Sequence, residues 1–170
     1  MNAWTVRYAS EGERRDDAAP SDAQAFAIEQ SLGYLVNRLA RSMAHDLAEE
    51  LRPVGIGIGQ WAVLLFLWAR DGLSQAELSR VVAIEPPTMV RTIDRMVRDG
   101  LVTRAPDAVD GRITRIHLTD HGRSLRHALV PKAEAVNASY LARLTATERG
   151  TLRRLLAKLL DRATSHEGTG

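Results

Sequence analysis

One segment of the chain combines arginines and hydroxyl groups at a spacing that suits contact with nucleic acid. Residues 84–100 read IEPPTMVRTIDRMVRDG, with two adjacent prolines before a run of helical periodicity. At 100° per residue, four polar side chains share an arc of about 100°: Thr88, Arg91, Thr92 and Arg95. Arginine can donate two hydrogen bonds to guanine, and threonine can contact a phosphate or a thymine methyl group. This face predicts DNA contacts, and an ordinary solvated helix face is the alternative.

The rest of the segment explains how such a helix is held in place. Pro86 and Pro87 suit the first helical turn, because proline has a preset φ and its missing N–H is not needed there. Apolar residues lie on the other side within about 120° and are expected to face the core: Met89, Val90, Ile93, Met96 and Val97. Asp94 lies further round, where we expect it to pair with a neighbouring arginine.

A shorter helix is predicted directly before this one. Ser74 and Glu77 form a capping-box pattern at the start of SQAELSRVVA, and a brief break follows at residues 84–85. Upstream, WAVLLFLWAR at residues 61–70 indicates a buried helix, and GIGIGQ at 55–60 indicates a flexible joint. A buried helix, a capped helix, a tight turn and a second helix follow one another in the order of a helix-turn-helix.

A β-hairpin is predicted after this helix. The apolar period changes from 3.6 to about 2, with strands at residues 101–104 and 113–118 around a turn at 106–111. The tip carries Asp110 and Arg112; a tip arginine can enter the minor groove, and we expect Asp110 to pair with an arginine. A plain turn is the alternative for the hairpin alone. The hairpin and the arginine face together favour a winged helix-turn-helix that binds DNA.

Long amphipathic helices flank this unit. Apolar residues recur at helical spacing over residues 23–51, and the last helix carries a stripe of Leu152, Leu155, Leu156, Leu159 and Leu160. We predict a mainly α fold with a small β-hairpin wing, that is, a winged helix-turn-helix at 56–118 and a helical dimerisation region at 23–55 and 119–165. Residues 1–22 are predicted to form a disordered or loosely docked arm, and residues 166–170 a flexible tail.

Several short motifs carry a family resemblance. They are GQWAVL at 59–64, LSQAEL at 73–78, IEPPT at 84–88, DRM at 94–96, and DGR at 110–112 followed by LTDHG at 118–122. In order and spacing they resemble the MarR family of bacterial transcription regulators, from residue 24 to about 163. The resemblance implies a homodimer with intertwined first and last helices, two winged heads on a palindrome, and control by a small ligand, often an aromatic anion. The family's wing usually has arginine where this chain has Gly111, which predicts weaker DNA affinity or a looser wing.

A candidate effector pocket lies near the predicted joint. Its residues are Tyr34, Arg41, His45, Trp61 and Trp68, with Met43 beside them. Core packing is the alternative for the two tryptophans. By analogy with the family, rings would stack against the ligand and Arg41 or His45 would face its carboxylate, so we expect a small aromatic acid as effector.

Several other classes of protein do not fit. The 170 residues include no cysteine, and the formal net charge is only +2. No nucleophile elbow or phosphate-binding glycine loop occurs, so we predict no enzyme, no catalytic residue and no cofactor. We also predict no metal site, the alternative being ligands among His45, His121 and His127. The N-terminal segment has no apolar core of signal-peptide length, and the longest apolar run, at residues 61–69, is too short to span a membrane, so we expect a cytoplasmic protein without a membrane partner.

The sequence thus predicts a sequence-specific transcription regulator, a ligand-responsive repressor that binds a palindromic operator as a homodimer. Its predicted contacts with double-stranded DNA are Ser74, Gln75, Pro86, Thr88, Arg91, Thr92, Arg95, Asp110 and Arg112. The alternative is an architectural protein that binds DNA without sequence preference and without an effector. A third hypothesis is a module that binds only other proteins.

Overall fold

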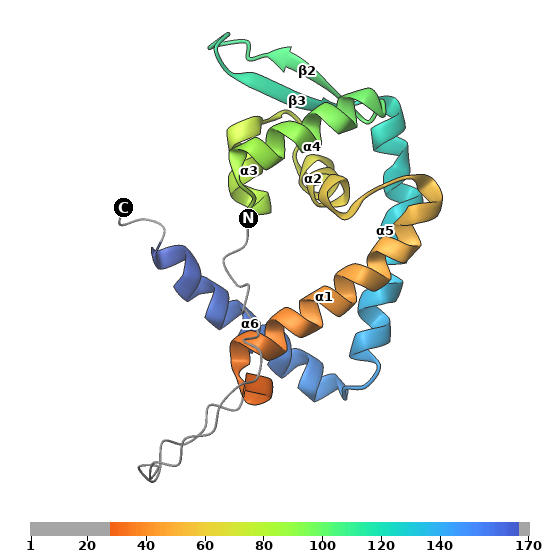
Figure 1. Ribbon diagram of the computed structural model, residues 1–170, viewed down its shortest axis with the longest axis vertical. Helices are drawn as coiled ribbons and strands as arrows, with labels where there is room; N and C mark the ends of the chain where they lie inside the picture. Colours follow the sequence, from red (N-terminus) through yellow and green to blue (C-terminus); the bar gives the residue numbers. More distant parts are fainter. Residues whose placement is uncertain (1–27, 167–170) are drawn as a thin grey trace, which may run out of the picture.

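The computed structural model describes residues 28–166, with side chains described as far as Asp161. The helices are α1 (Leu32–Leu51), α2 (Ile58–Ala69), α3 (Gln75–Val82), α4 (Pro86–Arg98), α5 (Asp120–Leu141) and α6 (Ala146–His166), and the strands are β1 (Leu73–Ser74), β2 (Val102–Pro106) and β3 (Thr114–Leu118). Figure 1 shows α2, α3, α4 and the hairpin gathered in one group, from which α5 leads away to α6. We call this group the head. The predicted mainly α fold with a hairpin wing is confirmed.

Two helices begin elsewhere than the sequence predicted. α1 starts at Leu32 because Ser31 caps it, its hydroxyl accepting the Tyr34 backbone N–H at 3.2 Å, while residues 28–30 form a separate 3-10 turn. α2 starts at Ile58 rather than at residue 61, and the Gln60 side-chain oxygen accepts the Gly57 N–H at 2.9 Å. The flexible joint is therefore shorter than predicted. The predicted arm and residues 167–170 of the predicted tail lie outside the described part of the chain, as do residues 23–27.

The core of the head forms around α4. Met89, Ile93 and Met96 are fully buried there, against buried residues of the other elements: Leu64, Leu67, Leu78, Leu101, Val102, Ile116 and Leu118. The steps of four and three residues place these three α4 side chains on one narrow stripe. Val90 and Val97 lie at its edges and are 39% and 37% exposed, so the prediction that they face the core was wrong.

The wing has a third strand that the sequence did not predict. The strand order is β1-β3-β2, and both neighbours run antiparallel to β3. β1 pairs Leu73 with Ile116 and Ser74 with Arg115. Because β1 has only two residues, it shows no alternating pattern, and only its pairing with residues 41 and 43 positions further along the chain defines it as a strand. β1 joins the wing to the start of α3.

α1 and α5 pack side by side outside the head. Lys132 donates to Glu50 at 2.8 Å, and the Tyr140 hydroxyl donates to Asp46 at 2.7 Å, so two polar contacts link the helices. Large apolar side chains nevertheless remain exposed on α1 and α6 of this single chain: Leu32, Leu35, Val36, Leu39, Leu155, Leu156, Leu159 and Leu160.

Among the described residues, no single helix is long and apolar enough to cross a membrane. Only residues 32–54 and 58–69 taken together, across a bend of 84°, reach that length and composition.

Candidate nucleic-acid interface

The turn between α3 and α4 fixes where both helices begin. The Ser74 hydroxyl accepts the Glu77 N–H at 3.2 Å and the Glu77 carboxylate accepts the Ser74 N–H at 2.7 Å, which confirms the predicted capping box. Ala83 ends α3 in a left-handed conformation with φ 56°, and the exposed Pro86 starts α4 as predicted. Gln75 is half-buried and Ser74 only 8% exposed. Ser74 therefore acts as a cap, and its contact with DNA stays a prediction.

The arginine and threonine face predicted on α4 is present. Thr88, Arg91 and Arg95 are exposed, whereas Thr92 is half-buried and donates its hydroxyl to the Thr88 carbonyl at 3.0 Å. Arg91 reaches the Thr88 hydroxyl at 3.4 Å. Arg95 lies 3.8 Å from the Asp99 carboxylate, with 64% of its side chain exposed. Both guanidinium groups thus stay accessible from outside the head.

An ion pair connects α4 to the wing. Asp94 accepts a hydrogen bond from Arg104 of β2 at 2.7 Å. The prediction that Asp94 pairs with an arginine is confirmed, and the arginine comes from the wing strand. The contact links the side of α4 to the middle of β2.

The tip of the wing is organised by main-chain hydrogen bonds. Asp110 accepts the Arg112 N–H at 3.0 Å through its side chain, and Arg112 itself is exposed. No ion pair joins Asp110 to an arginine among the described side chains, so that expectation was wrong; the acid that pairs is Asp107, with Arg115. Asp107 lies closer to the strands, within reach of a guanidinium on β3. Gly111 has open space around it, since nothing lies within 4 Å of an added Cβ.

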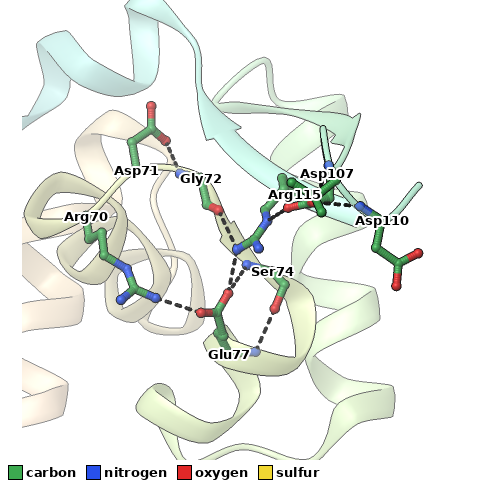
Figure 2. A network of polar contacts seen from close by, with 9 residues as sticks. Arg70, Asp71, Gly72, Ser74, Glu77, Asp107, Asp110 and Arg115 are labelled. Carbon is green, nitrogen blue, oxygen red and sulfur yellow. Dashed lines mark hydrogen bonds and ion pairs between the residues drawn. The ribbon is translucent and has the colours of Figure 1, made fainter. Parts of the chain in front are cut away.

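Arg115 is a residue that the sequence analysis missed. Figure 2 shows its guanidinium between the wing and the start of α3. It donates to Asp107 at 2.6 Å, to Glu77 at 2.9 Å and to the Gly72 carbonyl at 3.2 Å. Arg70 holds the other Glu77 oxygen at 2.7 Å. The sequence did contain one signal for this contact, since Arg115 lies in a predicted strand eight positions after Asp107 of the predicted turn.

These contacts favour the charged forms of the acids. The N–H groups of Asp110 and Val109, followed by Arg115, lower the pKa of Asp107 from 3.8 to about 2. The pKa of Glu77 is lowered chiefly by the Ser74 backbone N–H and hydroxyl, with Arg115 adding to the effect. The pKa of Arg115 is raised, first by its hydrogen bond to Asp107. The network therefore keeps its full charge throughout the neutral pH range.

A cavity of about 370 Å³ lies between α1, α2 and α5. It is lined by Met43, Ala44, Leu47, Ile58, Trp61, Leu65, Val130, Ala133, Glu134, Val136 and Asn137. Most of these side chains are apolar. Glu134 is the one ionisable residue among them, and Asn137 adds an amide.

The structure brings only part of the predicted effector residues to this cavity. Trp61 lines it, as does Met43. Tyr34, Arg41 and His45 are exposed on α1 and do not line it. Trp68 instead packs edge-on against Trp61, with ring centres 5.7 Å apart, and donates its indole N–H to the Gly122 carbonyl at 2.9 Å.

The histidines named as alternative metal ligands do not gather. His45, His121 and His127 are all exposed. Within residues 28–161, whose side chains the structure describes, no group of three histidines or acids is placed to share an ion.

A capped α3, an α4 with one exposed polar face, and a wing around one core define a winged helix-turn-helix DNA-binding protein. The family model described as the MarR family matches residues 54–113. The HTH-type transcriptional repressor Rv2887 of Mycobacterium tuberculosis is 32% identical over 134 residues, which make up 79% of this chain and 96% of that protein. This chain belongs to the MarR family.

Solved structures of related proteins share the fold. The apo form of wild-type MarR from E. coli is 28% identical with a TM-score of 0.68, covering 76% of this chain and 97% of that one. BpsR of Bordetella bronchiseptica, whose DNA binding is regulated by 6-hydroxynicotinic acid, is 25% identical with a TM-score of 0.74, covering 80% and 97%. The family and these relatives are transcription regulators and not enzymes.

Proposed function

We propose that the protein is a homodimeric repressor that binds a palindromic DNA operator and releases it on binding a small molecule. The observation that carries the proposal is that accessible arginines stand on two elements of one head, Arg91 and Arg95 on α4 and Arg112 on the wing. Repression is supported by the Mycobacterium tuberculosis relative, which is named a transcriptional repressor.

In this proposal the chain is divided by task. Residues 56–118 form the head that binds DNA, and residues 23–55 and 119–165 form the dimerisation region. Residues 1–22 are the proposed arm, and the proposed tail begins after α6, which ends at His166. The ion pair of Lys132 with Glu50 and the hydrogen bond of Tyr140 to Asp46 support treating α1 and α5 as one unit.

The DNA contacts follow from exposure and chemistry. α4 enters the major groove with its N-terminal part nearest the bases. Arg91, near the middle of α4, and Arg95, in its last turn, donate to guanine. Thr88, Thr92, Gln75 and Pro86 border the phosphates, and Ser74 holds the start of α3. Arg112 enters the adjacent minor groove, and Asp110 fixes its backbone.

The test begins with DNA selected from random fragments by the full-length protein. Arg91→Ala and Arg95→Ala should each weaken binding to the selected DNA, by about 1–3 kcal/mol for a bidentate guanine contact, and relax the preference at one position per half-site. Arg143→Ala is the matched control, because Arg143 is exposed beyond the end of α5 that lies away from the head. Unchanged affinity and footprint in both α4 variants would refute the proposed orientation of α4. Equal binding to all sequences would favour an architectural protein instead.

Dimerisation is proposed from the exposed apolar faces of α1 and α6. Leu155, Leu156, Leu159 and Leu160 are between 42% and 65% exposed in the single chain, which is unfavourable for large side chains on neighbouring turns. A two-fold contact would bury them. Leu159→Asp should convert the dimer to monomer in light scattering, because it would place an unpaired charge in the interface. Wild-type protein that is monomeric at micromolar concentration would contradict the proposal.

The cavity between α1, α2 and α5 is the proposed effector site. It has the volume of a small ligand site and a tryptophan in its wall. BpsR, which responds to an aromatic acid, supports the same class of effector here. The ring would lie against Trp61, and its carboxylate must point away from Glu134, because like charges repel.

Screening aromatic carboxylates by tryptophan fluorescence tests this site. An effector should quench fluorescence and release operator DNA over the same concentration range, since a ligand shifts an equilibrium only by its difference in affinity for the two states. Glu134→Gln should tighten binding of the acid and leave its uncharged amide analogue unaffected. A ligand that quenches without altering DNA affinity would contradict the coupling.

A further inference from the structure

We propose that Arg115 is a positioning residue that sets where the wing arginine, Arg112, stands relative to α4, and so determines selectivity for the DNA that flanks the central site. The inference rests on the proposed function and adds a residue that does not itself contact DNA in that proposal. Arg115 lies on β3, the central strand of the wing, between Ser74 of β1 and Ala105 of β2.

A continuous chain of short polar contacts runs from α3 to Arg112. Glu77, in the first turn of α3, accepts from Arg115 at 2.9 Å, and Arg115 donates to Asp107 at 2.6 Å. Asp107 accepts the Asp110 N–H at 3.0 Å, and Asp110 accepts the Arg112 N–H at 3.0 Å. Each link is a hydrogen bond to a carboxylate, which is stronger and more directional than a neutral one.

This series of hydrogen bonds ends at the start of α3 and at the wing tip. In the proposed function these two parts must keep a fixed spacing in order to contact DNA together. The Glu77 carboxylate caps α3 and thereby belongs to the rigid part of the head, which packs against α4. The wing turn, by contrast, has exposed residues from Ala108 to Arg112 and no buried side chain to fix it. Without Arg115 the turn keeps its own hydrogen bonds but loses its side-chain link to α3.

The planar guanidinium group of arginine is better suited than a lysine ammonium group to link the wing to α3. Its Nε faces Asp107 while Nη1 faces Glu77 and the Gly72 carbonyl, so one rigid group serves the wing and the head at once. Lysine offers a single ammonium group and cannot donate to Asp107 and Glu77 in the same fixed geometry. Arg70, directly after the end of α2, binds the same Glu77 carboxylate without reaching the wing, which makes it a matched control.

The experiment compares two DNA duplexes with the full-length protein, the selected operator and the same operator with randomised flanks. Arg115→Gln should weaken binding to the selected operator by about tenfold, the size of one lost base contact. It should hardly change binding to the operator with randomised flanks. Asp107→Asn should give the same loss of flank selectivity, although it changes the net charge in the opposite direction. Arg70→Gln should keep the selectivity, and Arg115→Lys should restore it only in part.

A double-mutant cycle separates positioning from general damage to the fold. In an Arg112→Ala background, Arg115→Gln should have no further effect on operator affinity, because the residue that it positions is gone. Additive losses, or equal losses on both duplexes, would overturn the inference and leave the proposed function standing. If Arg112→Ala alone leaves operator binding unchanged, the proposed wing contact is wrong and the inference falls with it. Should Arg115→Gln fail to fold, the same cycle with Asp107→Asn decides the question.

Discussion

Gly122 lies where α5 leaves the head, and replacing it with alanine should destabilise the protein. Gly122 is buried in the first turn of α5, and a Cβ built on it would lie 2.1 Å from the backbone oxygen of Leu101. Real Cβ atoms essentially never come closer than 3.0 Å to such an atom, so α5 and the start of the wing must separate by about 0.9 Å. The obstacle is backbone, which cannot rotate away as a side chain can.

The size of the effect follows from what this movement disturbs. The Leu101 oxygen accepts the Thr119 N–H at 3.0 Å, and the Gly122 carbonyl accepts the Trp68 indole N–H at 2.9 Å. Overpacking of this kind costs about 1–3 kcal/mol, and each stretched hydrogen bond loses up to about 1 kcal/mol. The better helix propensity of alanine returns about 1 kcal/mol. We expect Gly122→Ala to lower the free energy of unfolding by about 2–3 kcal/mol.

Gly150→Ala is the matched control for this variant. Gly150 lies within α6 with nothing within 4 Å of an added Cβ, so alanine there should be neutral or stabilise by up to about 1 kcal/mol. Thermal unfolding followed by circular dichroism, at one fixed protein concentration, should show Gly122→Ala melting about 4–12 °C below wild type. If the two alanine variants melt within about 1 °C of each other, the close approach of α5 to the wing is not a real constraint.

Two further predictions concern the wing. Gly111→Arg should tighten operator binding and steepen its salt dependence by about one phosphate contact, because the position has open space and the new side chain adds a cation beside Arg112. Unchanged affinity at every salt concentration would show that the wing does not lie near the DNA backbone. Asp107 has a folded pKa of about 2, below its ordinary 3.8, so it contributes stability that is present above about pH 4 and lost as the pH falls towards 2. Asp107→Asn should therefore be less stable than wild type at pH 7 and lose less stability between pH 4 and pH 2 in acid titrations followed by circular dichroism, and parallel curves would contradict this.

Local signals in the sequence were sufficient for the helices of the head. The capping box of Ser74 and Glu77 joins groups three residues apart, and the prolines before α4 act on the next turn of the same helix. The family resemblance predicted the class of protein, and the helical period predicted that Met89, Ile93 and Met96 of α4 face the core. Such features follow from the sequence because the interacting groups are neighbours along the chain.

Tertiary structure decided the parts that depend on distant residues. Glu77 and Arg115 are 38 positions apart and Gly72 and Arg115 are 43 apart, so neither β1 nor the link from α3 to the wing left a periodic signal. The same holds for the cavity, which Trp61 of α2 and Glu134 of α5 both line, whereas the exposed Tyr34, Arg41 and His45 do not. Helical spacing shows which residues share a face of one helix. Which face contacts another helix is decided only when the whole core packs, because each buried side chain is covered by elements that are far apart in the sequence.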